Sequence, residues 1–390
     1  MKLQELIAVL KSSEVVPQLV GNDVKLVGKT AALPPDIISN LKAQKNELIA
    51  FLRKANDRTA FTPIEPIPVQ QNYPASNAQK RIWLLTGFKG GSTAYNIVKG
   101  FILLGPLVKE NIDKAFQFCI QRHEILRTTF KEADGEIKQV ISADAAFQTE
   151  FVDISGIADC KSYLRSAIEV FNTTTFDLEQ GPLVRARLYK ISEEEHAILI
   201  ALHHIISDGW SLRLLIHEML VFYKALCRNE KTNRQPLRIQ YKDYCNWLNQ
   251  KNDGIQGQHA MNFWRSYLSG DIEPLNLNTA MARGKVRSFD GGRIKYYFDE
   301  NFYSSVLSFC KQHQVTIFNF FRATVTILLY KFSGQYNITI GSPVSGRNHF
   351  ELENQMGLYV NTLPLTIDVN AEDAFIEFLR RLYGDRKSVV

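Results

Sequence analysis

The pattern of hydrophobic and polar positions separates a short front region of the chain from a longer one. Within residues 3–10, apolar side chains follow the i, i+3, i+4, i+7 spacing of a helix with one apolar face. β-Branched residues then flank Gly21-Asn22-Asp23, which is a hairpin signal. A second apolar stripe over residues 37–52 predicts more helix. Together these patterns predict a small helix–hairpin–helix domain over residues 1–57.

A proline-rich stretch follows this front region. Residues 63–68 hold three prolines and few large apolar side chains, which is typical of an extended linker. We therefore place a linker at residues 58–71. Beyond it, strand and helix patterns alternate over residues 72–240 and begin again over residues 241–390. This alternation predicts an α/β (α+β) fold made of two halves with a similar order of elements.

Periodic segments in both halves predict individual elements. In the first half we expect helices at residues 112–120, 161–171 and 211–226, with Ser211 as the N-cap of the last, and strands near residues 122–130, 137–141, 183–191 and 196–204. In the second half we expect helices at residues 257–268, 301–313 and 317–331, and strands at residues 292–298 and 337–344.

Composition and charge exclude several classes of protein. The chain is 45% hydrophobic and 22% charged, and its formal net charge of +6 is spread without a basic block, which argues against nucleic-acid and membrane binding. The five cysteines are widely spaced, so they indicate reduced thiols rather than disulfides or a zinc site. No apolar run reaches the roughly 18 residues of a membrane helix, and the N-terminus lacks a signal peptide. We expect a cytoplasmic protein.

The stretch "HHIISDG", residues 203–209, carries the candidate chemistry. Successive strand residues face opposite sides, so we expect one of His203 and His204 to pack while the other enters a cleft. An imidazole can accept and return a proton near neutral pH. Gly209 leaves room for a ligand, and Asp208 could hold a cation or orient the loop. From the residues alone, acid–base chemistry, a metal site and a structural role all stay open.

The surrounding sequence resembles the condensation domains of nonribosomal peptide synthetases. "LHHIISDGWS" matches their HHxxxDG motif. Four further stretches resemble the family's other core motifs and occur in the family's order: "SNAQKRIWLL" at residues 76–85, "RHEILRTTF" at 122–130, "YKDYCNW" at 241–247 and "MGLYVNTLPL" at 356–365. The resemblance covers residues 72 to about 380.

This resemblance implies a chloramphenicol acetyltransferase-like fold with two lobes, residues 72–240 and 241–390, and a tunnel between them. Such domains form an amide bond in natural-product biosynthesis. The donor aminoacyl or peptidyl thioester and the acceptor aminoacyl thioester each arrive on the phosphopantetheine arm of a carrier protein. No cofactor or metal is bound. His204 maps to the active-site residue, which deprotonates or orients the acceptor amine, whereas His203 is expected to be structural.

The resemblance also assigns roles to neighbouring residues. Asp208 is expected to form a structural ion pair with an arginine, for which Arg347 is the first candidate, with Arg122 and Arg127 as rivals. Gly209 is expected to line the tunnel, and Ser211 and Asn361 to contact substrate. An epimerisation-type relative remains an alternative to peptide-bond formation, whereas heterocyclisation is disfavoured because cyclising relatives replace the histidine pair with aspartates.

Complete members of this family continue past the position of Val390 with further motifs. We therefore expect the second lobe to be incomplete, with apolar surface exposed. The alternative function is an inert fragment that only docks or binds.

Residues 1–57 resemble tubulysin-type N-terminal docking domains. The resemblance implies that the hairpin binds the C-terminal peptide of an upstream synthetase by strand addition, through Val24, Lys25, Leu26 and Lys29. The two lysines would favour an acidic peptide. A solvated helical cap without a partner is the alternative.

Overall fold

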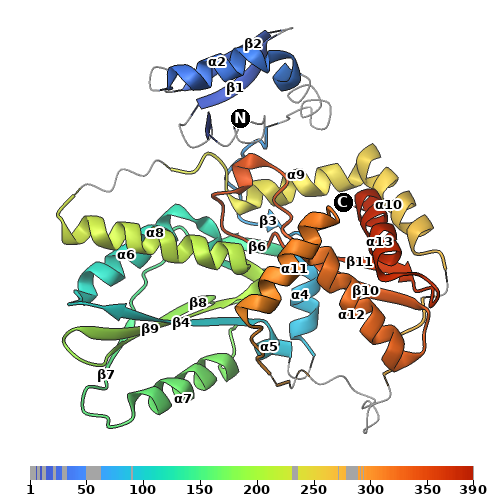
Figure 1. Cartoon of the computed structure of the whole chain (residues 1–390). Helices are drawn as coiled ribbons and strands as arrows, with labels where there is room; N and C mark the ends of the chain where they lie inside the picture. Colours follow the sequence, from blue (N-terminus) through green and yellow to red (C-terminus); the bar gives the residue numbers. More distant parts are fainter. Residues whose placement is uncertain are drawn as a thin grey trace. The chain divides into compact units, whose positions relative to one another are not determined.

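The computed structural model describes residues 6, 9–10, 15–20, 23–28, 33–49, 63–88, 91–230, 236–270, 272–277, 289, 291–292 and 294–389. The chain divides into two compact units, Met1–Ile64 and Glu65–Val390 (Figure 1). The boundary between them falls inside the expected linker, of which residues 63–71 are described and contain no helix or strand.

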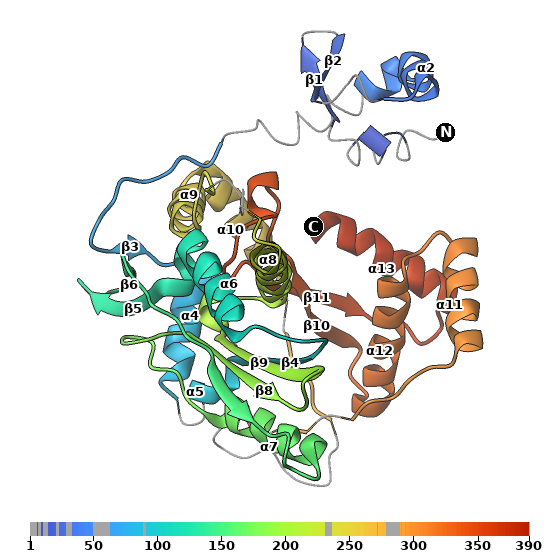
Figure 2. The same cartoon turned by 90° about the vertical axis from the view of Figure 1, so that its left-hand side faces the viewer.

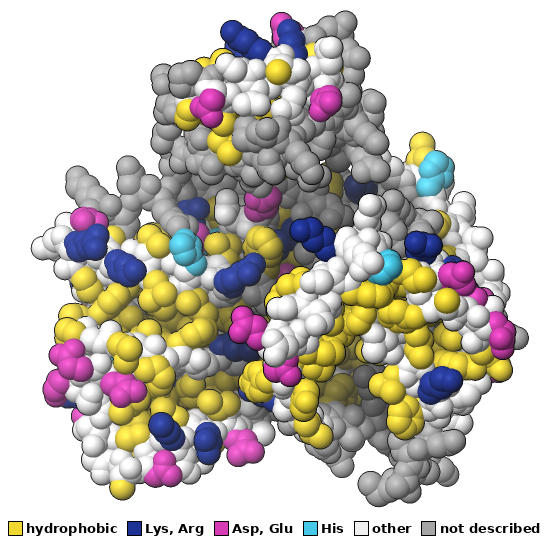
Figure 3. Space-filling model, viewed as in Figure 1, with side chains coloured by type: hydrophobic (Ala, Val, Ile, Leu, Met, Phe, Trp, Pro, Cys, Tyr) yellow, Lys and Arg dark blue, Asp and Glu magenta, His cyan; other side chains and the backbone are white. Residues whose placement is uncertain are grey.

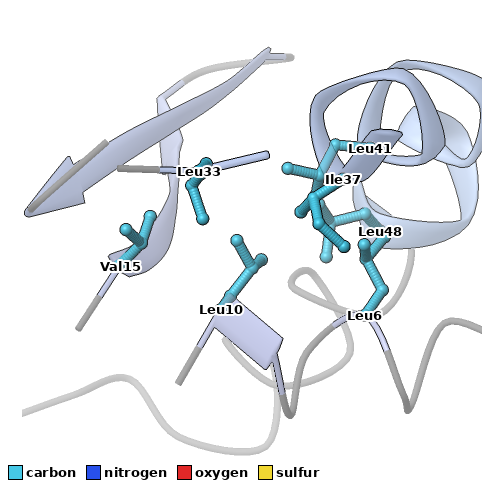
Figure 4. Packing of buried hydrophobic residues seen from close by; sticks show 7 residues of the cluster. All are labelled: Leu6, Leu10, Val15, Leu33, Ile37, Leu41 and Leu48. Carbon is cyan, nitrogen blue, oxygen red and sulfur yellow. The ribbon is translucent and has the colours of Figure 1, made fainter. Parts of the chain in front are cut away.

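The front unit contains the expected hairpin and helix. Strands β1 (Val15–Val20) and β2 (Asp23–Gly28) pair antiparallel, and α2 (Pro35–Ala43) begins with Pro35, which suits the first helical position. Its core consists of apolar side chains from β1, from α2 and from helical residues and loops outside these two elements (Figure 4): Leu6, Leu10, Val15, Leu33, Ile37, Leu41 and Leu48. Val24 and Leu26 of β2 are partly buried and pack against this core. Lys29 lies outside the described residues.

The second unit begins with a half, residues 72–240, that is built on a four-stranded sheet in the order β4–β9–β8–β7. Its strands are β4 (Asn96–Leu104), β9 (Glu195–His203), β8 (Val184–Lys190) and β7 (Glu150–Asp153), and its covering helices are α6 (Lys109–Arg122), α7 (Cys160–Thr173) and α8 (Gly209–Cys227). Helices α6 and α8 cover one face and α7 the other (Figures 1 and 2). Strand β9 is therefore buried on both faces, which explains its continuous apolar run.

The same half also contains a smaller three-stranded sheet, in the order β3–β6–β5. Its elements and neighbours are β3 (Tyr73–Pro74), β6 (Glu136–Ile141), β5 (Thr128–Ala133), α4 (Asn77–Thr86), α5 (Gly91–Ala94) and the 3-10 turn η2 (Glu124–Arg127). Ser76 caps α4 by accepting a hydrogen bond from the Gln79 amide, and the Gln79 side chain in turn accepts one from the Ser76 amide. The Gln79 side chain also donates to the carbonyl of Ile205 at 3.1 Å, so α4 is fixed beside the histidine pair.

The second half, residues 241–389, contains a two-stranded antiparallel sheet of β10 (Asn337–Val344) and β11 (Asn361–Asp368). Its helices are α9 (Tyr241–Asp253), α10 (Ile255–Tyr267), α11 (Glu300–Gln312), α12 (Ile317–Ser333) and α13 (Phe375–Val389), with the turn η4 (Phe350–Leu352). The core of this half lies between the sheet, α12 and α13, and includes Ala323, Ile338, Ile367 and Leu379.

Our prediction of a strand at residues 292–298 was wrong. Residues 294–299 have no regular structure, and the side chains of Ile294, Tyr296 and Phe298 are exposed. The alternating side-chain pattern of residues 294–298 is that of a strand, but no described strand pairs with them, and an isolated strand cannot satisfy its backbone groups.

Exposed apolar side chains also occur on α11 and α12, among them Tyr303, Leu328 and Phe332. Figure 3 shows hydrophobic side chains gathered over this half of the surface.

Two further observations bear on the class of protein. Within the described residues, no single helix is long and apolar enough to span a membrane; α11 and α12 pass such a test only as a pair, bent by 104°. The five cysteines are all free, and Cys119, Cys245 and Cys310 are buried.

Candidate functional site

His203 is a packed core residue. It ends β9, is fully buried, and lies between the rings of Tyr95 and Phe176, at centroid distances of 6.4 and 6.0 Å. Its Nδ1 accepts a hydrogen bond from the amide of Ile205 at 3.3 Å. Burial, with a smaller contribution from His204, lowers the pKa of His203 to about 4. His203 is therefore neutral near pH 7.

His204 is placed differently, although not by strand alternation. The strand ends at His203, and His204 opens the 3-10 turn η3 (His204–Ile206), so our expectation that the strand includes both histidines was wrong. The amide of His204 donates to the carbonyl of Tyr95 at 2.8 Å. Its side chain is half-buried, and its Nδ1 has no hydrogen-bond partner among the described residues. Of the two histidine residues, only His204 is partly exposed.

Asp208 caps helix α8 and joins the two halves. Its Oδ1 accepts hydrogen bonds from the amide and hydroxyl of Ser211 at 2.8 and 2.7 Å, so Asp208, not Ser211, is the N-cap. From the second half, Arg347 Nη2 lies 3.4 Å from Oδ1, and the amide of Tyr359 donates to Oδ2 at 3.1 Å. Both side chains of the Asp208–Arg347 pair are buried. The expected ion pair is present, and Asp208 points into a structural network.

The rival arginines lie elsewhere. Arg122 pairs with the buried Glu218 of α8 at 3.4 Å, and Arg127 pairs with Glu124 at 3.7 Å. Arg347 makes further contacts in its own half: its Nη1 donates to the carbonyls of Leu352 and Gln355.

Ser211 belongs to the same network. Its hydroxyl accepts hydrogen bonds from Arg347 Nη2 at 2.9 Å and from the Gly357 amide at 3.0 Å, and the Gly357 carbonyl lies 2.8 Å away. Ser211 is only 1% exposed. The geometry therefore gives Ser211 a role in joining the halves and offers no surface for the substrate contact that we expected.

Five residues whose contacts sequence reasoning missed complete this junction: Trp210, Tyr241, Glu353, Gly357 and Leu358. The Tyr241 hydroxyl donates to the carbonyl of Leu358 at 2.6 Å, and its ring occupies the space where a side chain at Gly357 would lie, 1.9 Å from an added Cβ. Trp210 Nε1 donates to the carbonyl of Glu353 at 3.0 Å. All but Glu353 lie within the motifs quoted above, but the motifs gave no sign that these residues touch.

Gly209 and Asn361 are both accessible. Gly209 is the first residue of α8, is exposed, and an added Cβ there would meet nothing within 4 Å. Asn361 opens β11, is exposed, and lines a cavity of about 760 Å³. This size suits a small-molecule site.

The cavity is formed by α4, α9, α10 and the loops at the ends of β10 and β11. Aromatic and aliphatic side chains such as Tyr244, Trp247 and Leu358 line it, together with Arg81 and Lys251. No Asp or Glu of the described part of the chain does so. His203, His204, Asp208 and Gly209 are not in its lining. Among the described residues, no group of three His, Cys, Asp or Glu side chains gathers as metal ligands would.

Comparison with known proteins shows the family of this chain. The condensation-domain family model matches residues 69–389. The chain belongs to the condensation-domain family, whose members are acyltransferase-type enzymes that form peptide bonds on carrier-protein thioesters.

Relatives include large synthetases from fungi and bacteria. The chain is 32% identical to malpinin synthetase of Mortierella alpina over 92% of this chain and 5% of that protein. It is 36% identical to a linear gramicidin synthase subunit of Brevibacillus parabrevis, over 81% of this chain and 6% of that protein. It is 34% identical to bacitracin synthase 2 of Bacillus licheniformis, over 86% of this chain and 12% of that protein. The chain thus spans a small part of the length of these relatives.

Similar solved structures agree on the fold. The X-domain from teicoplanin biosynthesis superposes with a TM-score of 0.76 at 23% identity, over 84% of this chain and 73% of that one. The first condensation domain of the calcium-dependent antibiotic synthetase superposes with a TM-score of 0.69 at 16% identity, over 82% of this chain and 74% of that one. A condensation domain from the enacyloxin polyketide synthase superposes with a TM-score of 0.69 at 19% identity, over 100% of this chain and 75% of that one.

Proposed function

We propose that this chain forms an amide bond between a donor aminoacyl or peptidyl thioester and an acceptor aminoacyl thioester, each held on a carrier protein. The acceptor amine attacks the thioester carbonyl carbon, the C–N bond forms, the C–S bond breaks, and the donor arm leaves as a thiol. The observation that carries the proposal is the half-buried His204 beside a fully buried His203 and a cross-half network at Asp208.

His204 acts on the amine proton in this proposal. A protonated amine is not a nucleophile, so a neutral imidazole that accepts or orients this proton favours attack, and the same imidazole can return the proton to the thiolate. Hydrogen bonding from the ring to the tetrahedral intermediate is the second possible contribution. The cavity beside Asn361 is the proposed approach of one of the arms. Family membership and relatives that are peptide synthetases support the reaction class.

The test supplies loaded donor and acceptor carrier proteins and looks for the dipeptidyl carrier by mass spectrometry. Because this chain covers 74% of the solved first condensation domain of the calcium-dependent antibiotic synthetase, the assay is run on this chain and on a chimera that adds the uncovered part of that domain. Product that is lost in His204→Ala supports the proposal. If both proteins fold and neither gives product, the catalytic proposal fails and a binding role is favoured. Exchange of the donor α-proton in deuterated water without product would indicate epimerisation.

We also infer that the front unit docks an extended C-terminal peptide from an upstream synthetase. What supports this is a two-stranded sheet with Lys25 exposed on β2, between Val24 and Leu26, whose side chains pack on the core. An added strand would gain main-chain hydrogen bonds, and Lys25 would favour acidic side chains. The full chain should bind a labelled acidic peptide, and Lys25→Glu or high salt should weaken binding. A peptide that binds Lys25→Glu equally well would contradict this role.

A further inference from the structure

The outer edge of the front hairpin has a defined set of backbone donors. Pro17 of β1 pairs with Leu26 of β2. Proline has no N–H, so this pair cannot be one of the hydrogen-bonded pairs that alternate along an antiparallel ladder. The backbone groups of Leu26 therefore point away from β1. Val24 lies two residues earlier on the same strand, so its N–H and C=O also face the outer edge of β2.

The two edges of the hairpin differ in their ability to accept a strand. The outer edge of β1 lacks a donor at Pro17, in the middle of the strand. The outer edge of β2 keeps its donors at Val24 and Leu26. Exposed edges with a complete set of donors are the ones that pair with other chains, and prolines normally protect against such pairing. The outer edge of β2 is therefore the competent one.

A carboxylate of the chain itself occupies the first donor of this edge. The Val24 amide donates to Asp23 Oδ1 at 2.7 Å. The same Oδ1 lies 2.8 Å from Lys45 Nζ, which comes from the helical residues 45–49. An amide and an ammonium group thus converge on one carboxylate. These contacts, with the Lys45 hydrogen bond first, lower the pKa of Asp23, so it is ionised near pH 7.

We propose that Val24 N–H and Lys45 Nζ form a carboxylate-binding site for an extended peptide of another chain, and that Asp23 occupies this site until the peptide displaces it. This inference rests on the docking function proposed above and names the chemistry of its partner: a carboxylate at the position where the added strand meets Val24. The carboxylate belongs either to the C-terminus of the peptide or to an acidic side chain.

Exposure makes the exchange feasible. The side chains of Lys45 and Asp23 are 48% and 70% exposed, and such surface pairs are weak and easily replaced. The strand itself does not need to move, because Val24 and Leu26 are packed against the core of the unit. An incoming carboxylate regains the same two charge-assisted contacts, while its backbone pairs with Leu26. Asp23 thus protects the edge against unspecific pairing and lets a carboxylate-bearing peptide in.

The test measures binding to the full chain by fluorescence anisotropy. The probe is a labelled nine-residue peptide of alternating Val and Asp with a free C-terminus, compared with its C-terminal amide and with a Val/Asn peptide in both forms. Asp23→Ala should tighten binding and Lys45→Gln should weaken it, each about two- to five-fold, as expected for an exposed ion pair. The exposed Lys42 of α2 is the matched control, and Lys42→Gln should leave binding unchanged.

The peptide arms identify the source of the carboxylate. A Lys45→Gln effect that disappears with the amide form indicates the C-terminus, and one that disappears with the Asn form indicates a side chain. If the wild-type chain binds the probe and neither Asp23→Ala nor Lys45→Gln changes the affinity, this inference is overturned while docking stands. If no peptide binds the wild-type chain or Asp23→Ala, the docking function fails and the inference with it.

Discussion

The amide of Tyr359 donates a hydrogen bond to Asp208 Oδ2 at 3.1 Å. Asp208 lies four residues after His204, and Tyr359 lies in the second half of the unit, just before β11. The loop that carries the candidate catalytic histidine is therefore bonded directly to the backbone of the opposite half. The Asp208–Arg347 pair and the Ser211–Gly357 contacts reinforce the same junction. The position of His204 thus depends on how the two halves are joined.

Replacing the two histidines should separate catalysis from stability. His204→Ala should lower dipeptide formation by about a hundredfold, which is the scale of lost general acid–base catalysis, with little change in melting temperature. His203→Ala should mainly destabilise the fold, by about 2 kcal/mol, because it empties a packed site between Tyr95 and Phe176. Mass spectrometry and thermal unfolding measure the two effects. Equal rate losses with unchanged melting in both variants would contradict these roles.

Removing Arg347 should destabilise the junction between the halves. Arg347→Ala leaves the buried Asp208 carboxylate without its cation, which we expect to cost about 3 kcal/mol in the free energy of unfolding measured with urea. Arg228 is the control, since its pair with Glu230 is exposed, and Arg228→Ala should change stability by less than about 0.5 kcal/mol. If both variants changed the free energy of unfolding by a similarly small amount, the buried Asp208–Arg347 pair would not be needed for stability.

The contact between Gly357 and Tyr241 should make Gly357 intolerant of any side chain. Gly357→Ala would place a Cβ within 1.9 Å of the Tyr241 ring, so either the loop or the ring must move. We expect a loss of stability of about 2 kcal/mol, the scale of overpacking, and a lower rate of condensation. Gly156, where an added Cβ meets nothing within 4 Å, is the control. Gly156→Ala should behave as the wild-type chain does in urea unfolding, and a tolerated Gly357→Ala would rule out the tight fit.

Stability should fall as the pH drops below about 6.5. The pKa of His203 is about 4 in the folded chain and 6.5 in the unfolded one, so only the unfolded state gains the proton in this window. The free energy of unfolding should therefore decrease by up to about 1.4 kcal/mol for each pH unit, and the effect should end near pH 4. Urea unfolding across this range measures the slope. His203→Gln should show a smaller slope, and an NMR titration of the His203 ring checks the pKa independently.

Much of the local structure follows from sequence. The apolar run of β9, the Val15–Gly28 hairpin, and the amphipathic patterns of α7, α11 and α12 each lie close to where the structure has them. Such elements are specified by residues near one another, through the side-chain spacing that one buried face requires. The motif order also pointed to the family that the comparison of residues 69–389 shows.

The relationships between residues that lie far apart in the sequence were decided only by the tertiary structure. Alternation placed both histidines in the strand, but the chain turns at His204, and packing against Tyr95 and Phe176 is what buries His203. The exposed 294–299 segment has the side-chain pattern of a strand without a partner to pair with. From the sequence we expected Ser211 to contact substrate, but in the structure its hydroxyl bonds to Arg347 and Gly357. These two residues lie 136 or more positions away along the chain. A sequence encodes periodicity locally, whereas hydrogen bonds and burial depend on which distant segments meet.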